Sequence, residues 1–114
     1  MAFRIPPHLR ESKRYIAFRV LAEREVNFQN VSAAILSSLE RWMGEKRLAE
    51  TGVKIHKSLW KKESHTGFVS CTVDAVDEVK VGLGLIHQIE DSRVLLHSLR
   101  VSGTIRSAQK KLKL

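Results

Sequence analysis

Cysteine is nearly absent from this sequence of 114 residues, and Cys71 is its single thiol. One thiol cannot form an internal disulfide and cannot build a cysteine-rich zinc site. This composition is typical of a protein in a reducing compartment. We expect Cys71 to act as a small buried hydrophobe in a strand.

Long apolar runs are absent too, since no stretch approaches the roughly 20 residues that a membrane-spanning helix needs. The first ten residues include Pro6 and Pro7 but no apolar core like that of a signal peptide. We therefore expect a cytoplasmic protein that has no membrane partner.

The usual signatures of an enzyme are also missing. The five histidines show no metal-ligand spacing, and there is no glycine-rich phosphate loop or nucleophile motif. Asp74, Asp77 and Glu78 could suggest a hydrolytic metal site, but a helix that is capped by Asp74 explains these carboxylates better. The sequence thus predicts no catalytic site in this chain and no bound metal or cofactor.

Positive charge is what the sequence has in excess. The formal net charge is +8 and the pI is near 10.1, and a basic domain of this size usually binds a polyanion, most often nucleic acid. Residues 1–19 contain five basic and one acidic residue, residues 93–114 six basic and none acidic, and residues 20–92 nine basic and eleven acidic. Either both ends converge on one RNA-facing surface, which we favour, or they form two solvated tails.

Hydrophobic periodicity predicts four strands. Apolar and polar residues alternate over residues 15–21, where Ile16, Phe18 and Val20 would share a buried face, and again over residues 53–60. β-branched and aromatic residues favour two more strands, and polar segments that end in glycine or serine predict the turns. The later strands span residues 68–73 and 94–101, and the turns residues 61–67 and 90–92.

A spacing of three and four residues predicts helices. Asn27 is placed to cap the first helix and Gly44 to end it, with one more turn beyond Gly44 that Gly52 closes. Asp74 would cap the second helix, in which two internal glycines suggest close backbone packing, and a short basic helix follows over residues 104–114. The positions expected in the core are Phe28, Val31, Ile35, Leu36, Leu39, Trp42 and Met43 in the first helix and Val76, Val79, Leu83 and Ile86 in the second.

The order strand-helix-strand-strand-helix-strand, followed by a terminal helix, is the split βαβ pattern. We therefore predict an α+β fold, a ferredoxin-like or RRM-like βαββαβ sandwich. Right-handed crossovers would place both long helices on one face of a four-stranded antiparallel sheet. The chain would form a single domain overall, with an extended basic arm (1–13), the ferredoxin-like part (14–101) and a basic C-terminal helix (102–114).

RNA-recognition domains of this topology stack bases on aromatic residues of the third strand, and residues 67–69 (Gly-Phe-Val) resemble a fragment of that signature. The rest of the signature is missing, so we expect Phe68 in the core. Backbone N–H groups at Ser102, Gly103 and Thr104, where the last helix begins, are a candidate phosphate site. A capping role for Ser102 or Thr104 is an equally good interpretation, and both roles can coexist.

Two motifs are recognisable. Residues 6–16 (PPHLRESKRYI) and residues 101–106 (VSGTIR) resemble the opening and closing motifs of the component 2 family of archaeal ribonuclease P, relatives of the eukaryotic Pop-five subunit. The resemblance spans nearly the whole chain. It implies a ferredoxin-like fold and an RNA-binding subunit that supports a catalytic RNA in removing the 5′ leader from precursor tRNA.

The resemblance also implies partners. These are the catalytic domain of the ribonuclease P RNA, which uses Mg²⁺, and the TIM-barrel-like component 3 in a heterotetramer of two of each; precursor tRNA would be bound only indirectly. The opening motif implies RNA contacts by Arg10, Lys13 and Arg14, and the closing motif implies one by Arg106. Charge alone adds Lys110 and Lys111.

Two other functions are left open by the residues themselves. A small-molecule-binding regulatory domain can share the βαββαβ topology, but such domains usually carry glycine in the first strand-to-helix turn, where this chain has residues 24–27 (REVN). A protein-only nuclease would use Asp74 or Asp77 as a catalytic carboxylate.

Overall fold

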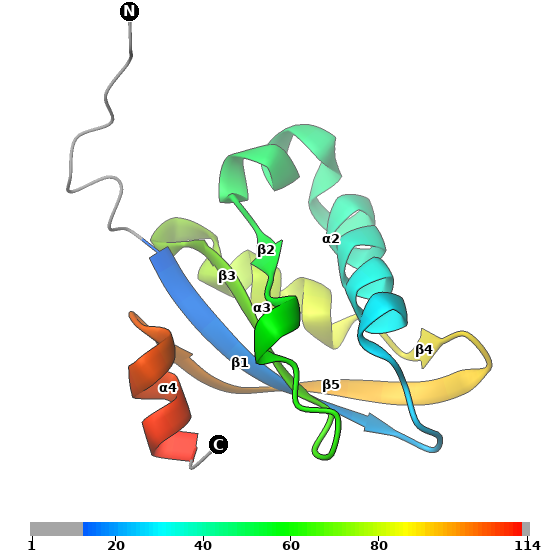
Figure 1. Ribbon diagram of the computed structural model, residues 1–114. Helices are drawn as coiled ribbons and strands as arrows, with labels where there is room; N and C mark the ends of the chain where they lie inside the picture. Colours follow the sequence, from blue (N-terminus) through cyan, green and yellow to red (C-terminus); the bar gives the residue numbers. More distant parts are fainter. Residues whose placement is uncertain (1–12, 113–114) are drawn as a thin grey trace, which may run out of the picture.

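A computed structural model describes the backbone of residues 13–112 and the side chains of residues 13–110, and its centre is a five-stranded antiparallel sheet (Figure 1). The sheet has the order β2-β3-β1-β5-β4. This is the predicted βαββαβ arrangement with one short edge strand added, so the predicted fold class is confirmed. The strands are β1 (Lys13–Ala22), β2 (Lys54–Ile55), β3 (Thr66–Thr72), β4 (Gln88–Ile89) and β5 (Ser92–Ser102).

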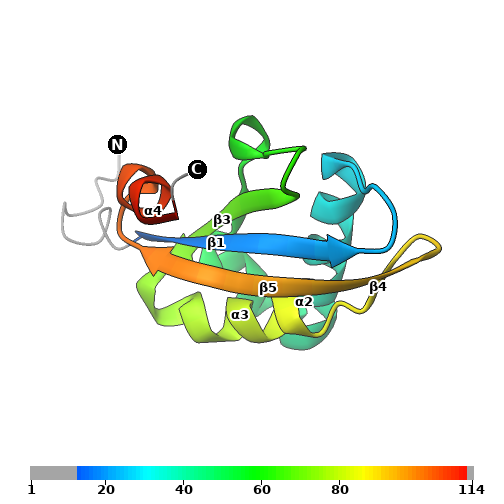
Figure 2. The ribbon, with the colours of Figure 1, turned by 90° about the horizontal axis from the view of Figure 1, so that it is seen from below.

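Two helices cover one face of the sheet and a third lies on the other face (Figure 2). α2 (Phe28–Thr51) and α3 (Val76–Gly84) pack on the main core, as predicted for the two long helices. α4 (Ile105–Leu112) lies on the opposite face, where a second, smaller cluster of buried residues forms. Among the described residues, no helix is long and apolar enough to cross a membrane.

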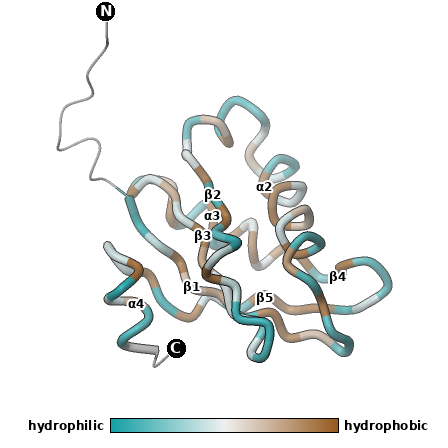
Figure 3. Tube along the Cα trace, viewed as in Figure 1, coloured by the Kyte–Doolittle hydropathy of each residue, from teal (hydrophilic) through white to brown (hydrophobic). Residues whose placement is uncertain are grey.

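Alternation along β1 sorts its side chains between these two layers. Ile16 and Phe18 are fully buried toward the helices, whereas Ala17 is fully buried in the cluster under α4. Phe68 of β3 belongs to this second cluster, and Cys71 is buried on the other face, so both predicted core positions are confirmed. Hydrophobic residues follow the strands, while the loops are hydrophilic (Figure 3).

α2 begins as predicted, and the predicted further turn closes at Gly52. The Asn27 side chain accepts a hydrogen bond from the backbone N–H of Asn30 (2.8 Å), and Gly52 closes the helix in the left-handed conformation (φ 61°). Gly44 kinks the helix instead of ending it, because its φ of 81° and ψ of 161° are not helical and the chain resumes the helix afterwards. The core prediction is wrong for Trp42 and Leu36, which are 47% and 42% exposed because the apolar stripe is wider than the contact with the sheet.

The predicted strand over residues 53–60 is wrong beyond Lys54 and Ile55. The backbone N–H of His56 still donates to the carbonyl of Phe68 (3.0 Å), but residues 57–59 then form a 3₁₀ turn. The alternation of apolar residues predicts a strand here, but a 3₁₀ turn has three residues per turn, and Lys57 and Ser58 are both exposed in it while Leu59 is half-buried.

Asp74 does not cap α3, contrary to the prediction. A 3₁₀ turn (Val73–Ala75) precedes the helix, and the Asp74 carboxylate instead accepts a hydrogen bond from the Thr72 hydroxyl (2.6 Å) and pairs with Arg47 (3.5 Å). The expected boundaries also move slightly: Lys13, assigned to the arm, begins β1, and Ser102, assigned to the last helix, ends β5. Residues 1–12 lie outside the described part of the chain.

Candidate nucleic-acid interface

The start of β1 and the end of β5 lie side by side, which brings the described residues of the opening motif, 13–16, beside the closing motif. Tyr15 is opposite Ser102 and Ile16 is opposite Val101 in the antiparallel ladder. α4 follows directly and contacts both strands (Figure 1). For the described residues, the predicted convergence of the two ends is therefore confirmed.

Lys13 and Arg14 leave β1 on opposite sides of the strand, because successive side chains alternate. Lys13 is exposed, and Arg14 is half-buried with its Nη1 donating to the carbonyl of Lys13 (2.9 Å). The Arg14 guanidinium also lies beside Gly103, where a Cβ would stand 3.8 Å from Nη1. Arg10 lies outside the described residues, and RNA contact by Lys13 and Arg14 stays a prediction.

Ser102 and Thr104 both cap the start of α4. The Thr104 hydroxyl accepts a hydrogen bond from the backbone N–H of Ser107 (3.1 Å), and the Ser102 hydroxyl accepts one from that of Thr104 (3.4 Å). These contacts occupy two of the N–H groups that a bound phosphate would use. The capping interpretation is confirmed, and phosphate binding at this helix end stays a prediction.

Arg106 and Lys110 are exposed and lie one helical turn apart on α4. Ala108, between them in sequence, is fully buried against the sheet, so the two basic side chains point away from it. The side chain of Lys111 lies outside the described part of the molecule.

Acidic residues are absent from the three long strands and from α4, that is, from β1, β3, β5 and residues 105–112. Within the described chain, all carboxylates lie instead in α2, α3 and the connecting turns. The sheet therefore separates a layer of mixed charge from a layer with only positive charge. We call this second layer the basic sheet face; its cationic members are Lys13, Arg19, Arg93, Arg100, Arg106 and Lys110, with His97 among them.

Part of the basic sheet face is not covered by α4. Arg19 is opposite His97 and Leu21 is opposite Leu95, and all four side chains are exposed, the two leucines by 49% and 55%. Arg93 continues the same row beyond Leu95. This end of the sheet thus presents cationic and apolar side chains together, a mixture that suits both the phosphates and the sugars or bases of RNA.

Arg100 occupies a special position on this face. The ladder shifts between Ala17 and Phe18, which pair with Arg100 and Ser98, so Leu99 is an extra residue in β5. Such a bulge re-aims the side chains around it. The Nε of Arg100 is buried without a hydrogen-bond partner among the described residues.

The cations of the basic sheet face are free of carboxylate partners in the described structure. The ion pairs among the described residues lie elsewhere. Arg47 contacts Glu50, Asp74 and Glu78, and Lys62 contacts Glu25. Positive charges that no acidic residue neutralises are the electrostatic requirement for phosphate binding.

His56 adds a titratable group at the edge of this face. Its Nε2 lies 2.9 Å from the Ser70 hydroxyl, and its ring centroid lies 5.7 Å from that of Tyr15. Burial, followed by the positive charges of Lys54 and Lys13, lowers the pKa of His56 below its usual value. The histidine is thus neutral at physiological pH while it lies among cations.

Asp74 and Glu78, two of the three carboxylates that could suggest a metal site, belong to an ion-pair network on the helical side. The Arg47 guanidinium binds both carboxylate oxygens of Glu78, with Nη2 donating to Oε1 (2.6 Å) and Nε to Oε2 (3.2 Å), and this hydrogen-bonded contact lowers the pKa of Glu78. The hydrogen bond from Thr72 and the charge of Arg47 likewise lower the pKa of Asp74. Among the described residues there is no group of three or more metal-ligating side chains.

Arg19, Arg93 and Arg100 are missing from the contacts that the sequence predicts, although they lie on the same face as α4. The available signal was their position between buried strand residues, such as Phe18 and Val20 on either side of Arg19. The two terminal motifs, residues 6–16 and 101–106, contain none of these three arginines.

Comparison with known proteins identifies the family of this chain. The sequence profile of the Rpp14/Pop5 family matches residues 14–113. Ribonuclease P protein component 2 of Archaeoglobus fulgidus is 35% identical over 107 residues, which cover 94% of this chain and 94% of the relative. The protein of the same name from Methanocaldococcus jannaschii is 36% identical over 105 residues, which cover 92% of this chain and 75% of the relative.

The fold has a solved counterpart. A chain in a cryo-EM structure of yeast ribonuclease MRP superposes with a TM-score of 0.61 at 10% sequence identity, covering 90% of this chain and 89% of that one. At this identity the likeness shows a shared fold alone. Since the family profile covers most of the sequence, the predicted family resemblance is confirmed, and this chain belongs to the Rpp14/Pop5 family.

Proposed function

We propose that this chain is an RNA-binding protein subunit of ribonuclease P and that the basic sheet face contacts the RNA. The observation that carries the proposal is the absence of acidic residues from β1, β3, β5 and α4, together with the free cations there. Arginine and lysine side chains neutralise phosphates and release counterions, so binding would weaken as salt rises. The family membership supports an RNA ligand over other polyanions.

We propose further that the RNA performs the chemistry and that this chain supports it. The RNA would use Mg²⁺ to remove the 5′ leader from precursor tRNA, and the protein would contribute no catalytic group. Its partners would be the catalytic domain of that RNA and the barrel-like component 3, in a heterotetramer of two of each. A cytoplasmic location fits the single thiol, Cys71, which is buried.

The test is reconstitution of the ribonucleoprotein with and without this chain, followed by precursor-tRNA cleavage over a range of Mg²⁺ concentrations. We expect the protein to raise the cleavage rate and to lower the Mg²⁺ concentration that cleavage requires. Unchanged rate and unchanged Mg²⁺ demand would contradict the proposed function. Cleavage by the isolated chain without RNA would contradict the assignment of the chemistry to the RNA.

A further inference from the structure

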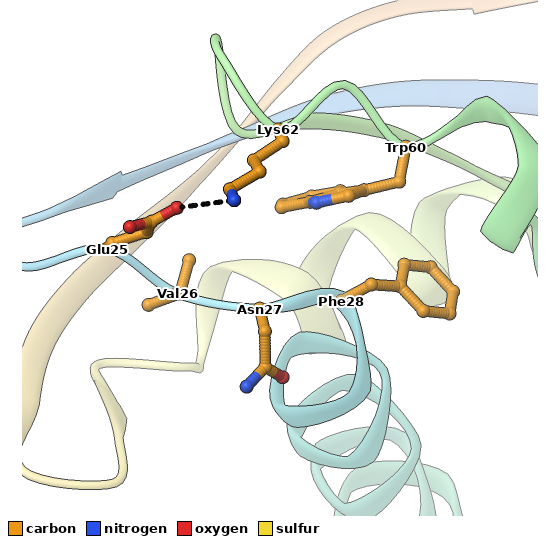
Figure 4. Close-up of a pocket in the computed structure, with 6 residues that line it drawn as sticks. All are labelled: Glu25, Val26, Asn27, Phe28, Trp60 and Lys62. Carbon is orange, nitrogen blue, oxygen red and sulfur yellow. Dashed lines mark ion pairs between the residues drawn. The ribbon is translucent and has the colours of Figure 1, made fainter.

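A pocket lies at the end of β1 that is away from α4. Its volume is about 440 Å³, and it opens between the turn that follows β1 and the hairpin loop between β2 and β3 (Figure 4). The ten residues of β1 separate it from Lys13, a span of about 30 Å at the usual rise of a strand. Its lining is Glu25, Val26, Asn27, Phe28, Trp60 and Lys62.

The indole of Trp60 forms one wall of this pocket and is held by other rings. Its centroid lies 6.4 Å from Phe18 and 6.1 Å from Phe28, and the imidazole of His65 stacks nearly parallel to it (6.1 Å, 13°). Gly67 leaves the room for this arrangement, since a Cβ there would stand 3.0 Å from the indole and 2.8 Å from the Phe18 ring. The aromatic wall is therefore preorganised.

Polar groups stand at the mouth. Lys62 and Glu25 form an ion pair (3.5 Å) between side chains that are 74% and 66% exposed, and such an exposed pair is weak and easily exchanged. Figure 4 shows the Lys62 ammonium near the edge of the Trp60 ring. A ligand in the pocket would thus find a flat aromatic wall, a hydrogen-bond donor and a carboxylate acceptor.

We propose that this pocket binds a single unpaired base of the RNA, which stacks on Trp60 and hydrogen-bonds at its edge with Lys62 and Glu25. The inference rests on the proposed function, because it takes RNA as the ligand. Single-stranded bases stack on exposed aromatic side chains in this way, and the pocket volume lies in the range of small-molecule sites.

The chemistry favours a base over an apolar side chain of a protein partner. A leucine or phenylalanine inserted beside Trp60 would cover Lys62 and Glu25 without giving either a new hydrogen-bond partner, and such desolvation is unfavourable. A base has a flat π-face for the indole and donors and acceptors on its rim for both charged groups.

The pocket adjoins the end of β1 that carries Arg19, although Trp60 and Val26 pack with the core on the helical side. Thr66 pairs with Arg19 on one side and with Lys61 on the other, and the backbone N–H of Val20 donates to the carbonyl of His65 (2.8 Å). The hairpin loop that carries Trp60 is thereby attached to the uncovered end of β1. A strand of RNA that crosses Arg19 would reach the pocket next.

Tryptophan fluorescence tests the proposal directly. The full chain carries two tryptophans, so Trp42→Phe leaves Trp60 as the only reporter and leaves the pocket lining unchanged. We expect an oligonucleotide of eight adenosines to quench this emission, and we expect inorganic polyphosphate of similar charge, which has no bases, to leave it unchanged. Equal quenching by both, or no quenching by the oligonucleotide at saturation, would overturn the proposal.

Substitution of Trp60 gives an independent measurement. Trp60→Leu should weaken binding of the oligonucleotide about tenfold, as expected for the loss of one stacked base, with no change in the slope of affinity against salt. Trp60→Phe keeps an aromatic wall and should retain most of the affinity, which separates stacking from misfolding. Full affinity in a folded Trp60→Leu protein would contradict the proposal.

Failure of this inference and failure of the proposed function are distinguishable. If the pocket binds no base, salt-dependent RNA binding through the basic sheet face persists and only the Trp60 signals are lost. If the chain does not bind RNA, neither the oligonucleotide nor the ribonuclease P RNA binds at low salt. Quenching by the barrel-like partner protein, with none by the oligonucleotide, would assign the pocket to a protein contact and overturn the inference.

Discussion

The backbone of Gly82 in α3 lies directly against the side chain of Leu39 in α2. A Cβ on Gly82 would stand 3.3 Å from Cγ of Leu39 and closer still to its Cδ2, nearer than real Cβ atoms approach. The buried hydroxyl of Ser38 donates to the carbonyl of Gly82 (2.7 Å) at the same place. The two helices therefore cross at the one position in α3 where only glycine fits.

We expect Gly82→Ala to lower the free energy of unfolding by about 1–3 kcal/mol, because the added methyl group overpacks a rigid contact. Denaturant unfolding would measure this change. Gly84→Ala is the matched control, since no atom lies within 4 Å of the Cβ position there. The control should leave stability unchanged or raise it by up to about 1 kcal/mol through better helix propensity. Equal losses in both variants would contradict the assignment of the crossing to Gly82.

Neutralising the basic sheet face should weaken RNA binding in a salt-dependent way. We expect Arg19→Ala and Arg93→Ala each to lower the affinity for ribonuclease P RNA and to reduce the slope of log affinity against log salt by about one. Lys80→Ala is the control, because Lys80 is an exposed cation on α3, in the helical layer. Filter binding at several salt concentrations distinguishes them, and an identical effect of all three variants would argue against a localised interface.

His56 should make the protein less stable below neutral pH. Because its pKa is lowered in the folded state, the unfolded chain binds the proton more readily. The stabilisation is therefore complete above the unfolded pKa of about 6.5 and is lost as the pH falls toward the folded pKa. NMR titration should give a pKa below 6.5 for this ring, and His56→Gln should flatten stability between about pH 5 and 7. A pKa above 6.5 would contradict the described environment.

The network around Arg47 should contribute stability at neutral pH that disappears in acid. The lowered pKa values of Glu78 and Asp74 mean that their ionised forms are favoured by folding. This contribution is present above their unfolded pKa values of about 4 and is lost as the pH falls through the folded values.

The variant Arg47→Met tests this network, because methionine keeps much of the apolar stem. It should be less stable than the parent chain at pH 7, and the difference should shrink as carboxylates become protonated. Arg41→Met, at an exposed position of the same helix, should show no such pH dependence. Thermal unfolding over a pH series would measure both, and a constant difference across that series would show that packing is responsible.

Most of the sheet and both long helices could be predicted because their side chains repeat at a regular spacing. Ile16 and Phe18 in β1, and Val31 and Ile35 in α2, lie in the core where alternation and helical periodicity place them. The alternation over residues 53–60 predicts a strand, but the strand ends at Ile55 and a 3₁₀ turn follows. Its conformation is decided by contacts with Phe18 and β3 that a local pattern does not contain.

The candidate interface was predictable only in part. Terminal motifs and charge counts indicated that the ends would meet, and the pairing of Tyr15 with Ser102 bears this out. The register that sets Arg19 opposite His97 depends on the bulge at Leu99, and long-range pairing of this kind leaves no trace in either strand alone. The pocket beside Trp60 was missed for the same reason, since its walls come from two loops distant in sequence.

Like charges gathered on one side of a small domain repel one another whenever no ligand neutralises them. No carboxylates along β1, β3, β5 and α4 offset this repulsion. It destabilises the folded protein when no ligand is bound and favours the binding of any polyanion. The protein's thermal midpoint should therefore climb in concentrated sodium chloride, and nucleic acid from an expression host should accompany it through purification until the buffer is salty enough to compete.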